Sequence, residues 1–152
     1  MIVTLYFVTF LMSVVALISL LLRNKRVDSL FFMLGLFVSF NCLGRFLLSI
    51  STTMDMAIWA TRILYIGAMY CPVVLIMVLA QLCDLEMPKW VRMMLVTASS
   101  VVLGFVFTVG YSPVYYKEME LVQTEDYSYL VKTYGPAHAL YPASLVISIS
   151  VM

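Results

Sequence analysis

Long apolar segments separated by short polar segments dominate this chain. Apolar runs cover residues 2–22, 30–50, 57–83 and 91–109, and a further run begins at residue 137 and continues to residue 152. A helix needs about 20 apolar residues to cross a bilayer core that is about 30 Å thick. The pattern therefore predicts an all-α integral membrane protein, a multi-span helical bundle in which five transmembrane helices are present.

The composition favours a membrane protein over a soluble one. Hydrophobic residues make up 64% and charged residues 11% of the 152 residues, and the mean hydropathy is +1.04. A soluble globular domain is roughly half apolar and a quarter charged, so we expect lipid to be the solvent for most of this chain. The net charge of +1 and the lack of a basic stripe give no indication of a nucleic-acid partner.

One long polar stretch, from Tyr111 to Pro142, separates the fourth and fifth predicted spans, and residues 111–136 form the loop itself. Within it, β-favouring residues at 114–121 and 127–133 are separated by Gln-Thr-Glu-Asp, which predicts a short β-hairpin. The many tyrosines suit the headgroup region of a membrane, where an apolar ring and a polar hydroxyl group both find partners. An aromatic cap that binds a ligand is the alternative interpretation.

The distribution of lysine and arginine predicts how the chain is oriented. The first and third connections between spans carry the basic residues Arg23, Lys25, Arg26, Lys89 and Arg92. The second connection carries none, and the polar stretch has more acidic than basic residues. Because basic loops are retained in the cytoplasm, we expect the N-terminus and the β-hairpin to lie outside the cell. The fifth span has no cytoplasmic exit, so we expect the chain to be a truncated part of a longer protein.

Three polar side chains within the predicted spans are candidates for a functional site. Asn41 and Arg45 lie one turn apart on one face of the second span, and Arg62, near the start of the third span, is expected at similar depth. Ionisable groups inside a membrane are costly and usually face the bundle interior or a wet cavity. One hypothesis is an outward-open pocket for an anionic or polar ligand. The other is that the arginines extend to the membrane surface and that Asn41 forms an interhelical hydrogen bond.

Two further features concern helix packing. Pro72 removes a backbone donor near the middle of the third span, and we expect a kink there that serves either as a hinge or as a packing device. Small residues also recur at four-residue spacing, as in Gly67 with Cys71 and in Ser100 with Gly104. Such pairs favour close approach of helix backbones in lipid.

The sequence contains no combination of residues that indicates catalysis. It has no Gly-rich phosphate loop, no nucleophile paired with a base and no spaced set of metal ligands, so we expect neither a metal nor a cofactor. The three cysteines lie in or at the end of apolar runs and are interpreted as packing residues. His138, the single histidine, is expected to be a hydrogen-bonded structural residue, and a pH-sensing role is the alternative.

Several segments, taken together, resemble a known family, the N-terminal seven-helix region of bacterial histidine kinases. Its third helix has a basic residue, two apolar residues, Tyr-x-Gly and then Pro, and the corresponding segment here is Arg62-Ile-Leu-Tyr65-Ile-Gly67 with Pro72 after it. The opening of its fifth helix is similar to Tyr134-Gly135-Pro136-x-His138 with Tyr141 after it. The preceding segment Tyr115-Tyr116-Lys117 resembles versions of the region that are fused to GGDEF-type diguanylate cyclases.

The resemblance covers nearly the whole chain, about five of seven spans. It implies a membrane sensor with a cytoplasmic histidine kinase or GGDEF output domain, placed in the bacterial inner (plasma) membrane and forming a homodimer at full length. The implied partners are the lipid bilayer and a small-molecule or membrane-derived signal. The candidate ligand-binding residues are Asn41, Arg45, Arg62, Tyr65, Tyr134, His138 and Tyr141. The candidate structural or hinge residues are Gly67, Pro72, Gly135 and Pro136.

We therefore expect a transmembrane sensory input module that passes an extracellular or membrane signal to a cytoplasmic output domain. The main alternative is a fragment of a transporter or permease. That would have broken helices, polar groups near the bilayer midplane and repeat symmetry. The charged residues lie near the ends of the predicted spans and no repeat is visible, which favours the sensor. A small structural membrane subunit is a third alternative.

Overall fold

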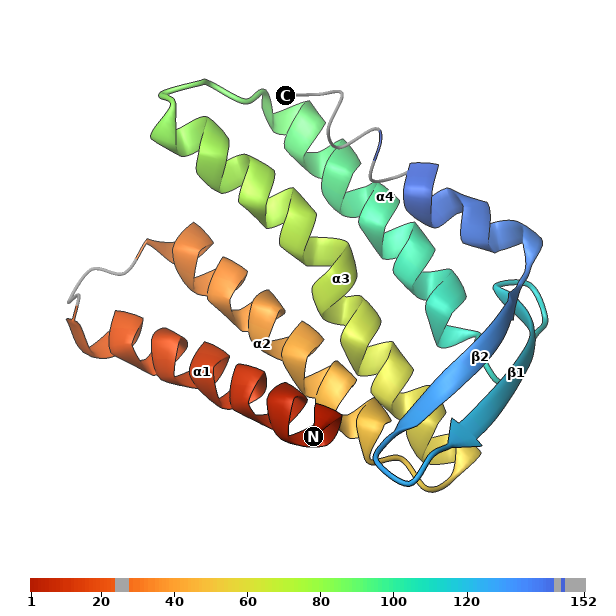
Figure 1. Ribbon diagram of the computed structural model, residues 1–152. Coiled ribbons are helices and arrows are strands. Elements are labelled where there is room, and N and C mark those ends of the chain that lie inside the picture. Colours follow the sequence, from red (N-terminus) through yellow and green to blue (C-terminus); the bar gives the residue numbers. More distant parts are fainter. Residues whose placement is uncertain (24–27, 144–145, 147–152) are drawn as a thin grey trace.

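A row of four long helices forms the body of the computed structural model, which describes residues 1–23, 28–143 and 146 (Figure 1). The helices are α1 (Ile2–Arg23), α2 (Ser29–Ser49), α3 (Met54–Leu82) and α4 (Lys89–Phe107). All four are long and apolar enough to cross a membrane. Helices that follow one another along the chain pack against each other, as expected where short loops join antiparallel neighbours. The predicted helical architecture is confirmed for these four helices.

Half of the predicted fifth span, residues 137–152, lies outside the described residues. The described part begins with a short 3-10 helix, η1 (Pro136–Ala139), and continues as a helical turn at residues 140–143. Proline suits the start of a helix because the first backbone N–H groups of a helix have no partner within it.

Helices α2 and α3 pack closely because glycines lie at their contact. A Cβ atom added at Gly67 would overlap with the carbonyl oxygen of Phe37 and the backbone nitrogen of Asn41. A Cβ atom added at Gly44 would overlap with the backbone of Leu64 in the same way. The two backbones can therefore approach as they do only with glycine at these positions.

The pair of Ser100 and Gly104 differs. A Cβ atom at Gly104 would meet no described atom within 4 Å, so among the described residues no helix backbone approaches closely there. Ser100 instead shares a hydrogen bond with Tyr70, with 2.8 Å between the hydroxyl oxygens, and links α4 to α3 through side chains. Helix α3 continues through Pro72 as one helix, and a hinge role for this proline stays a prediction.

The predicted β-hairpin is present. Strand β1 (Tyr116–Gln123) pairs antiparallel with β2 (Ser128–Tyr134). The backbone amide of Thr124 donates a hydrogen bond of 2.9 Å to the carbonyl of Tyr127 and closes the turn. The strands begin slightly later than predicted because the chain before β1 is used to fasten the base of the hairpin.

Backbone contacts fasten this base. The Gly135 amide donates to the Tyr115 carbonyl at 2.9 Å, and the Ala137 amide donates to the Val114 carbonyl at 3.1 Å. A Cβ atom at Gly135 would overlap with the carbonyl oxygen of Val114. Gly135 therefore allows the end of β2 to press against the segment that enters β1, which supports its structural assignment.

The hairpin lies across one end of the helix row, beside the α2–α3 turn (Figure 1). We call this the hairpin end of the bundle, and we call the end with the α3–α4 connection the loop end. Strand β1 contacts α3, and β2 contacts α2. Near the tip, the side-chain amide of Gln123 donates a 2.7 Å hydrogen bond to the carbonyl of Thr52. The hairpin is thus held at its tip as well as at its base.

A buried hydrophobic core lies at the hairpin end and joins α3, α4 and the hairpin. Its members are Tyr65, Met69, Val102, Val106, Val109, Tyr115, Tyr116 and Ala137. Helix α1, by contrast, exposes large apolar side chains such as Leu5, Met12 and Leu22. Exposed apolar side chains along a long apolar helix are expected where lipid is the solvent.

Candidate functional site

Six aromatic side chains from separate parts of the chain meet at the hairpin end, and we call them the aromatic cluster. Its members are Tyr65, Tyr115, Tyr116, Tyr134, His138 and Tyr141. They come from α3, the hairpin and its base, η1 and the turn after it. Four of the candidate ligand-binding residues named from the sequence, Tyr65, Tyr134, His138 and Tyr141, are brought together here.

A hydrogen bond between two tyrosines connects the cluster to the helices. The hydroxyl oxygens of Tyr65 on α3 and Tyr116 on β1 lie 2.5 Å apart. The fully buried Tyr115 packs edge-on against Tyr65, with 5.8 Å between ring centroids. Edge-to-face pairs of this kind add to the free energy gained from burial. The hairpin and its base therefore contact α3 directly through side chains.

His138 contributes a ring to the cluster. Its imidazole stacks on Tyr134, with 3.9 Å between centroids and 30° between planes. Tyr115 lies on another side, 5.5 Å away between centroids. These contacts place the histidine among rings, and a hydrogen-bonded role for it stays a prediction.

Lys132 brings a positive charge to the cluster. Its Nζ lies 4.9 Å from the ring centroid of Tyr116 and 5.7 Å from that of Tyr65. The same Nζ lies 3.5 Å from the Tyr116 hydroxyl oxygen. Within residues 1–23 and 28–143, no carboxylate lies within ion-pair distance of this ammonium group. The tyrosine rings attract the cation, but they leave its charge without an anionic partner.

Burial sets the protonation states of the hairpin residues. It lowers the pKa of Lys132 to about 8, because a buried ammonium group loses favourable hydration. It raises the pKa of Tyr115 and of Tyr116, and the neighbouring Tyr65 adds to both shifts. At neutral pH both phenols are therefore uncharged, and most Lys132 side chains carry a proton.

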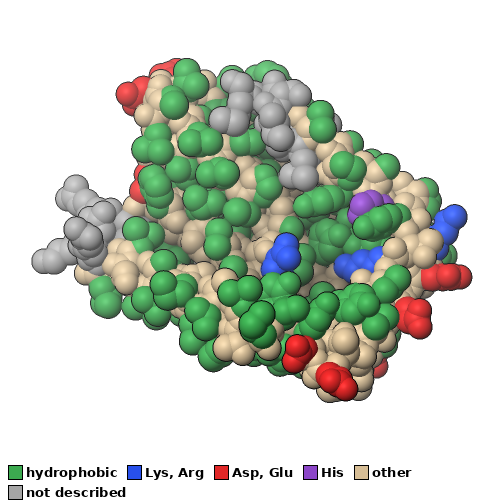
Figure 2. Space-filling model, viewed as in Figure 1, with side chains coloured by type: hydrophobic (Ala, Val, Ile, Leu, Met, Phe, Trp, Pro, Cys, Tyr) green, Lys and Arg blue, Asp and Glu red, His purple; other side chains and the backbone are tan. Residues whose placement is uncertain are grey.

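Asn41 and Arg45 lie beside the aromatic cluster on α2. The Arg45 Nε donates a 3.2 Å hydrogen bond to the Asn41 side-chain oxygen, so the predicted shared helix face is confirmed. The Arg45 side chain is exposed and acts electrostatically on Tyr141. Figure 2 shows Lys or Arg side chains on the visible face of the molecule, near the chain's single histidine and bordered by hydrophobic side chains.

Arg62 has different neighbours. Its Nη2 donates a 2.9 Å hydrogen bond to the carbonyl of Val109, and its guanidinium lies 4.8 Å from the ring centroid of Trp59. Only 6% of Arg62 is exposed, so its side chain is buried between the start of α3 and the end of α4. Arg62 therefore packs toward the end of α4, whereas Tyr65, one turn away, packs under the hairpin.

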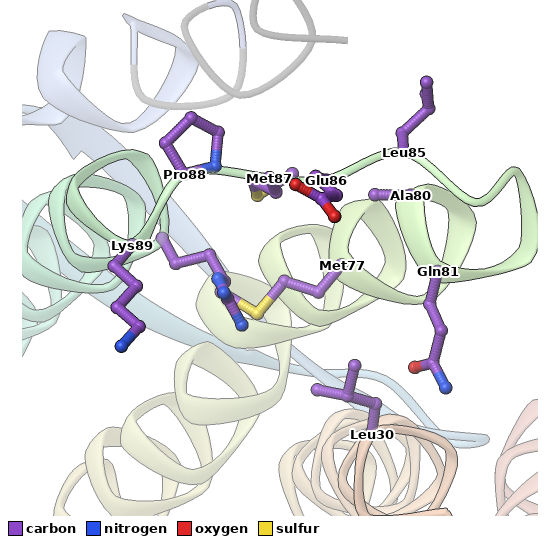
Figure 3. A pocket seen from close by; sticks show the side chains of 10 residues that line it. Leu30, Met77, Ala80, Gln81, Leu85, Glu86, Met87, Pro88 and Lys89 are labelled. Carbon is purple, nitrogen blue, oxygen red and sulfur yellow. The ribbon is translucent and has the colours of Figure 1, made fainter.

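A pocket of about 560 Å³ lies at the loop end. Figure 3 shows side chains that line it, including Met77, Gln81, Glu86 and Lys89. The Gln81 side-chain amide also donates a hydrogen bond to the Asp28 carboxylate at the start of α2. The candidate residues named from the sequence do not line this pocket. The loop end thus offers a cavity, and the hairpin end offers the concentration of polar and aromatic groups.

Sequence reasoning named the histidine and several tyrosines, but it missed Lys132. The missed signal was strand alternation. Side chains of a β-strand point alternately to opposite faces, and in β2 the partly buried residues are Ser128, Leu130 and Lys132. A lysine on the inner face of a hairpin loses part of the hydration of its ammonium group, which indicates a specific role, whereas a lysine on the outer face stays hydrated. Tyr115 and Tyr116 were named only as part of the family resemblance.

The arrangement is suited to binding an anionic group. Among the described residues, no group of His, Cys, Asp or Glu side chains is arranged to hold a metal ion. An ammonium group, a guanidinium and several phenols can hold an anionic group beside an apolar or aromatic surface.

Comparisons with known proteins agree with the resemblance. Searches of curated protein sequences and of solved structures found no match to this chain. The family described as the N-terminal 7TM region of histidine kinase matches residues 4–152. This chain belongs to that family of membrane-spanning sensor regions.

Proposed function

We propose that this chain receives a signal at its hairpin end and passes it through the helix bundle to a cytoplasmic output domain. The output domain would be a histidine kinase, with a GGDEF diguanylate cyclase as the other form. Family membership and four helices of membrane-spanning length support this proposal. The proposed location is the bacterial inner membrane. The distribution of lysine and arginine favours an orientation with the N-terminus and the hairpin outside the cell. The parent protein would act as a homodimer.

One observation carries the proposal. The ammonium group of Lys132 is half-buried against Tyr116 and Tyr65, and it has no carboxylate partner in the described part of the chain. A buried charge without a counter-ion is costly. A ligand with an acidic group would supply the missing charge, and its apolar body would pack on the tyrosine rings. Arg45 provides a second cation on the same side. We therefore propose an amphipathic anion as the ligand class.

The proposed route for the signal starts at the Tyr65–Tyr116 hydrogen bond. An anion bound to Lys132 draws the ammonium group away from Tyr116 and alters the contact between β1 and α3. Helix α3 then shifts against α2 at the close contact around Gly67, and Pro72 supplies the point of flexibility. A ligand can move such an equilibrium only through unequal affinity for the two arrangements.

The transporter alternative requires helices that are interrupted near the middle of the membrane. Helices α1 to α4 are continuous over 22, 21, 29 and 19 residues. This continuity favours a sensor over a transporter, and it favours movement of whole helices as the way a signal is passed.

A binding experiment tests the ligand class. The protein is purified in detergent, and its thermal stability is followed with acetate, benzoate or octanoate added. Benzoate and octanoate are expected to stabilise it and acetate is not, because only the first two have an apolar body. Lys132→Met should abolish the effect. Lys117→Met, on the exposed part of β1, is the matched control and should retain it. Equal responses of the two variants would rule out Lys132 as the binding cation.

A further inference from the structure

A buried arginine lies between the start of α3 and the end of α4. Arg62 is 6% exposed, and it donates from Nη2 to the carbonyl of Val109 at 2.9 Å. Its Nε is buried and has no hydrogen-bond partner in the part of the chain that the structure describes. No carboxylate within residues 1–23 or 28–143 comes within ion-pair distance of it. Because a guanidinium remains charged at any physiological pH, this site lacks an anion.

Aromatic rings surround this charge without replacing the missing acceptor. The Arg62 guanidinium carbon lies 4.8 Å from the ring centroid of Trp59, 5.4 Å from that of Tyr111 and 5.9 Å from that of Phe107. The rings attract a cation through their faces, but they accept no hydrogen bond in the guanidinium plane. Trp59 and Tyr111 are 58% and 86% exposed. Exposed tryptophan and tyrosine at the end of a membrane helix are typical of the headgroup region.

A pocket lies at this position. It has a volume of about 330 Å³, and its lining includes Asp55, Trp59, Arg62, Gly110 and Tyr111. Gly110 has a positive φ of 91°, a backbone conformation that glycine adopts without strain. The turn at Gly110 carries the chain away from α4 and leaves Tyr111 at the side of the pocket.

The second charged residue of this pocket is an acid. Asp55 precedes Arg62 by seven residues on α3, so the two side chains leave the same helix face about 10 Å apart along the axis. A purely anionic ligand at Arg62 would be repelled by this carboxylate. A ligand with an anion at one end and an ammonium group at the other would satisfy both residues.

We propose that Asp55 and Arg62 bind the zwitterionic headgroup of a phospholipid. Two donors of the guanidinium hold the phosphodiester in the fork geometry that arginine favours. The primary ammonium of an ethanolamine headgroup donates to Asp55, and the acyl chains follow the exposed apolar surface beside Trp59. This site is separate from Lys132 and the aromatic cluster, so it does not depend on the proposed sensory ligand. Lipid binding at this site would make the packing of α3 against α4 depend on the lipid composition of the surrounding leaflet.

Native mass spectrometry on the full chain tests the proposal. The protein is stripped of lipid in detergent and mixed with phosphatidylethanolamine or with phosphatidylglycerol of the same acyl chains. We expect the ethanolamine lipid to bind about tenfold more tightly, the typical contribution of a charge-assisted hydrogen bond. Asp55→Asn changes an exposed side chain and should remove this preference while the chain stays folded. Arg62→Gln should weaken the binding of both lipids about tenfold.

Arg92→Gln is the matched control, because Arg92 is exposed at the loop end of α4 and does not line this pocket. It should bind both lipids as the unmodified chain does. Glycerophosphoethanolamine carries the same charged groups without acyl chains and should compete only at much higher concentration. The proposal is overturned if Asp55→Asn keeps the preference for the ethanolamine lipid. Competition by glycerophosphoethanolamine at the concentration of the lipid would instead identify a soluble ligand and overturn the lipid assignment.

Discussion

The ammonium nitrogen of Lys132 lies 4.9 Å from the ring centroid of Tyr116, on the inner face of the hairpin. The same Tyr116 shares a 2.5 Å hydrogen bond with Tyr65 on α3. One residue of β1 therefore contacts both the uncompensated charge of the hairpin and the third helix. In the proposed function, this relationship would link the binding of a ligand under the hairpin to the packing of the helices.

The lowered pKa of Lys132 predicts how stability depends on pH. The folded-state pKa is about 8 and the ordinary value is 10.5, so folding disfavours the charged form. Below about pH 8 the full cost of burying the charge is present. From pH 8 to 10.5 the unfolded chain binds more protons than the folded chain, and stability rises with pH.

The measurement for this prediction is the unfolding midpoint in detergent at each pH, compared between the unmodified chain and Lys132→Met. The variant should be more stable at pH 7 by about 1–2 kcal/mol, because the buried charge is removed. The difference should disappear toward pH 10.5. Taking the difference cancels the titration of the tyrosines. A constant difference between the two proteins across this range would contradict the assigned pKa.

The Tyr65–Tyr116 pair predicts a non-additive response to mutation. Removing either hydroxyl group, as Tyr65→Phe or Tyr116→Phe, leaves the other without its closest partner and should cost about 1–2 kcal/mol. The double variant leaves neither hydroxyl behind, so its cost should be about 1 kcal/mol smaller than the sum of the single costs. Thermal unfolding of the unmodified chain, the two single variants and the double variant gives the double-mutant cycle. Tyr129→Phe, in β2, is the control and should have little effect, and strict additivity would show that the two hydroxyl groups do not interact.

Much of this architecture could be predicted from the sequence because it depends on local patterns. The length of each apolar run gives the helices, and the β-favouring residues on either side of residues 122–126 give the hairpin. The positions of Tyr134 and His138 followed from the family resemblance. These predictions need no knowledge of which helix packs against which.

The partners of the charged residues could not be predicted, because they depend on tertiary contacts. Arg45 and Arg62 have the same chemistry and similar places in their helices, yet Arg45 is exposed and Arg62 is 94% buried. The difference arises because α4 ends beside Arg62 and offers the Val109 carbonyl, which no spacing rule indicates. Likewise, Gly67 and Gly104 have the same small-residue spacing, but only Gly67 faces another helix.

This contrast between glycines predicts opposite effects of the same substitution. Gly67→Ala places a methyl group against the backbone of α2 and should destabilise the protein by about 1–3 kcal/mol. Gly104→Ala places it in open space and should stabilise the protein by up to about 1 kcal/mol, because alanine is the better helix former. Thermal unfolding in detergent measures both. Equal destabilisation by the two variants would mean that α2 and α3 do not approach as closely as described.

The proposed orientation, with the hairpin outside the cell, predicts a labelling pattern for cysteines at opposite ends of the bundle. Thr124 lies at the exposed hairpin tip, and Cys83 is exposed at the loop end. In intact cells, a membrane-impermeant maleimide should label Thr124→Cys in a Cys83→Ser background. It should leave Cys83 of the unmodified chain unlabelled until the membrane is permeabilised. The two ends of α3 are separated by the length of a 29-residue helix, about 43 Å at 1.5 Å per residue, so both sites cannot lie on the same side of a bilayer that the helix crosses.

The reverse pattern, with Cys83 labelled in intact cells and residue 124 protected, would invert the orientation. It would also place Lys132 and its aromatic neighbours in the cytoplasm, where an extracellular ligand could not reach them.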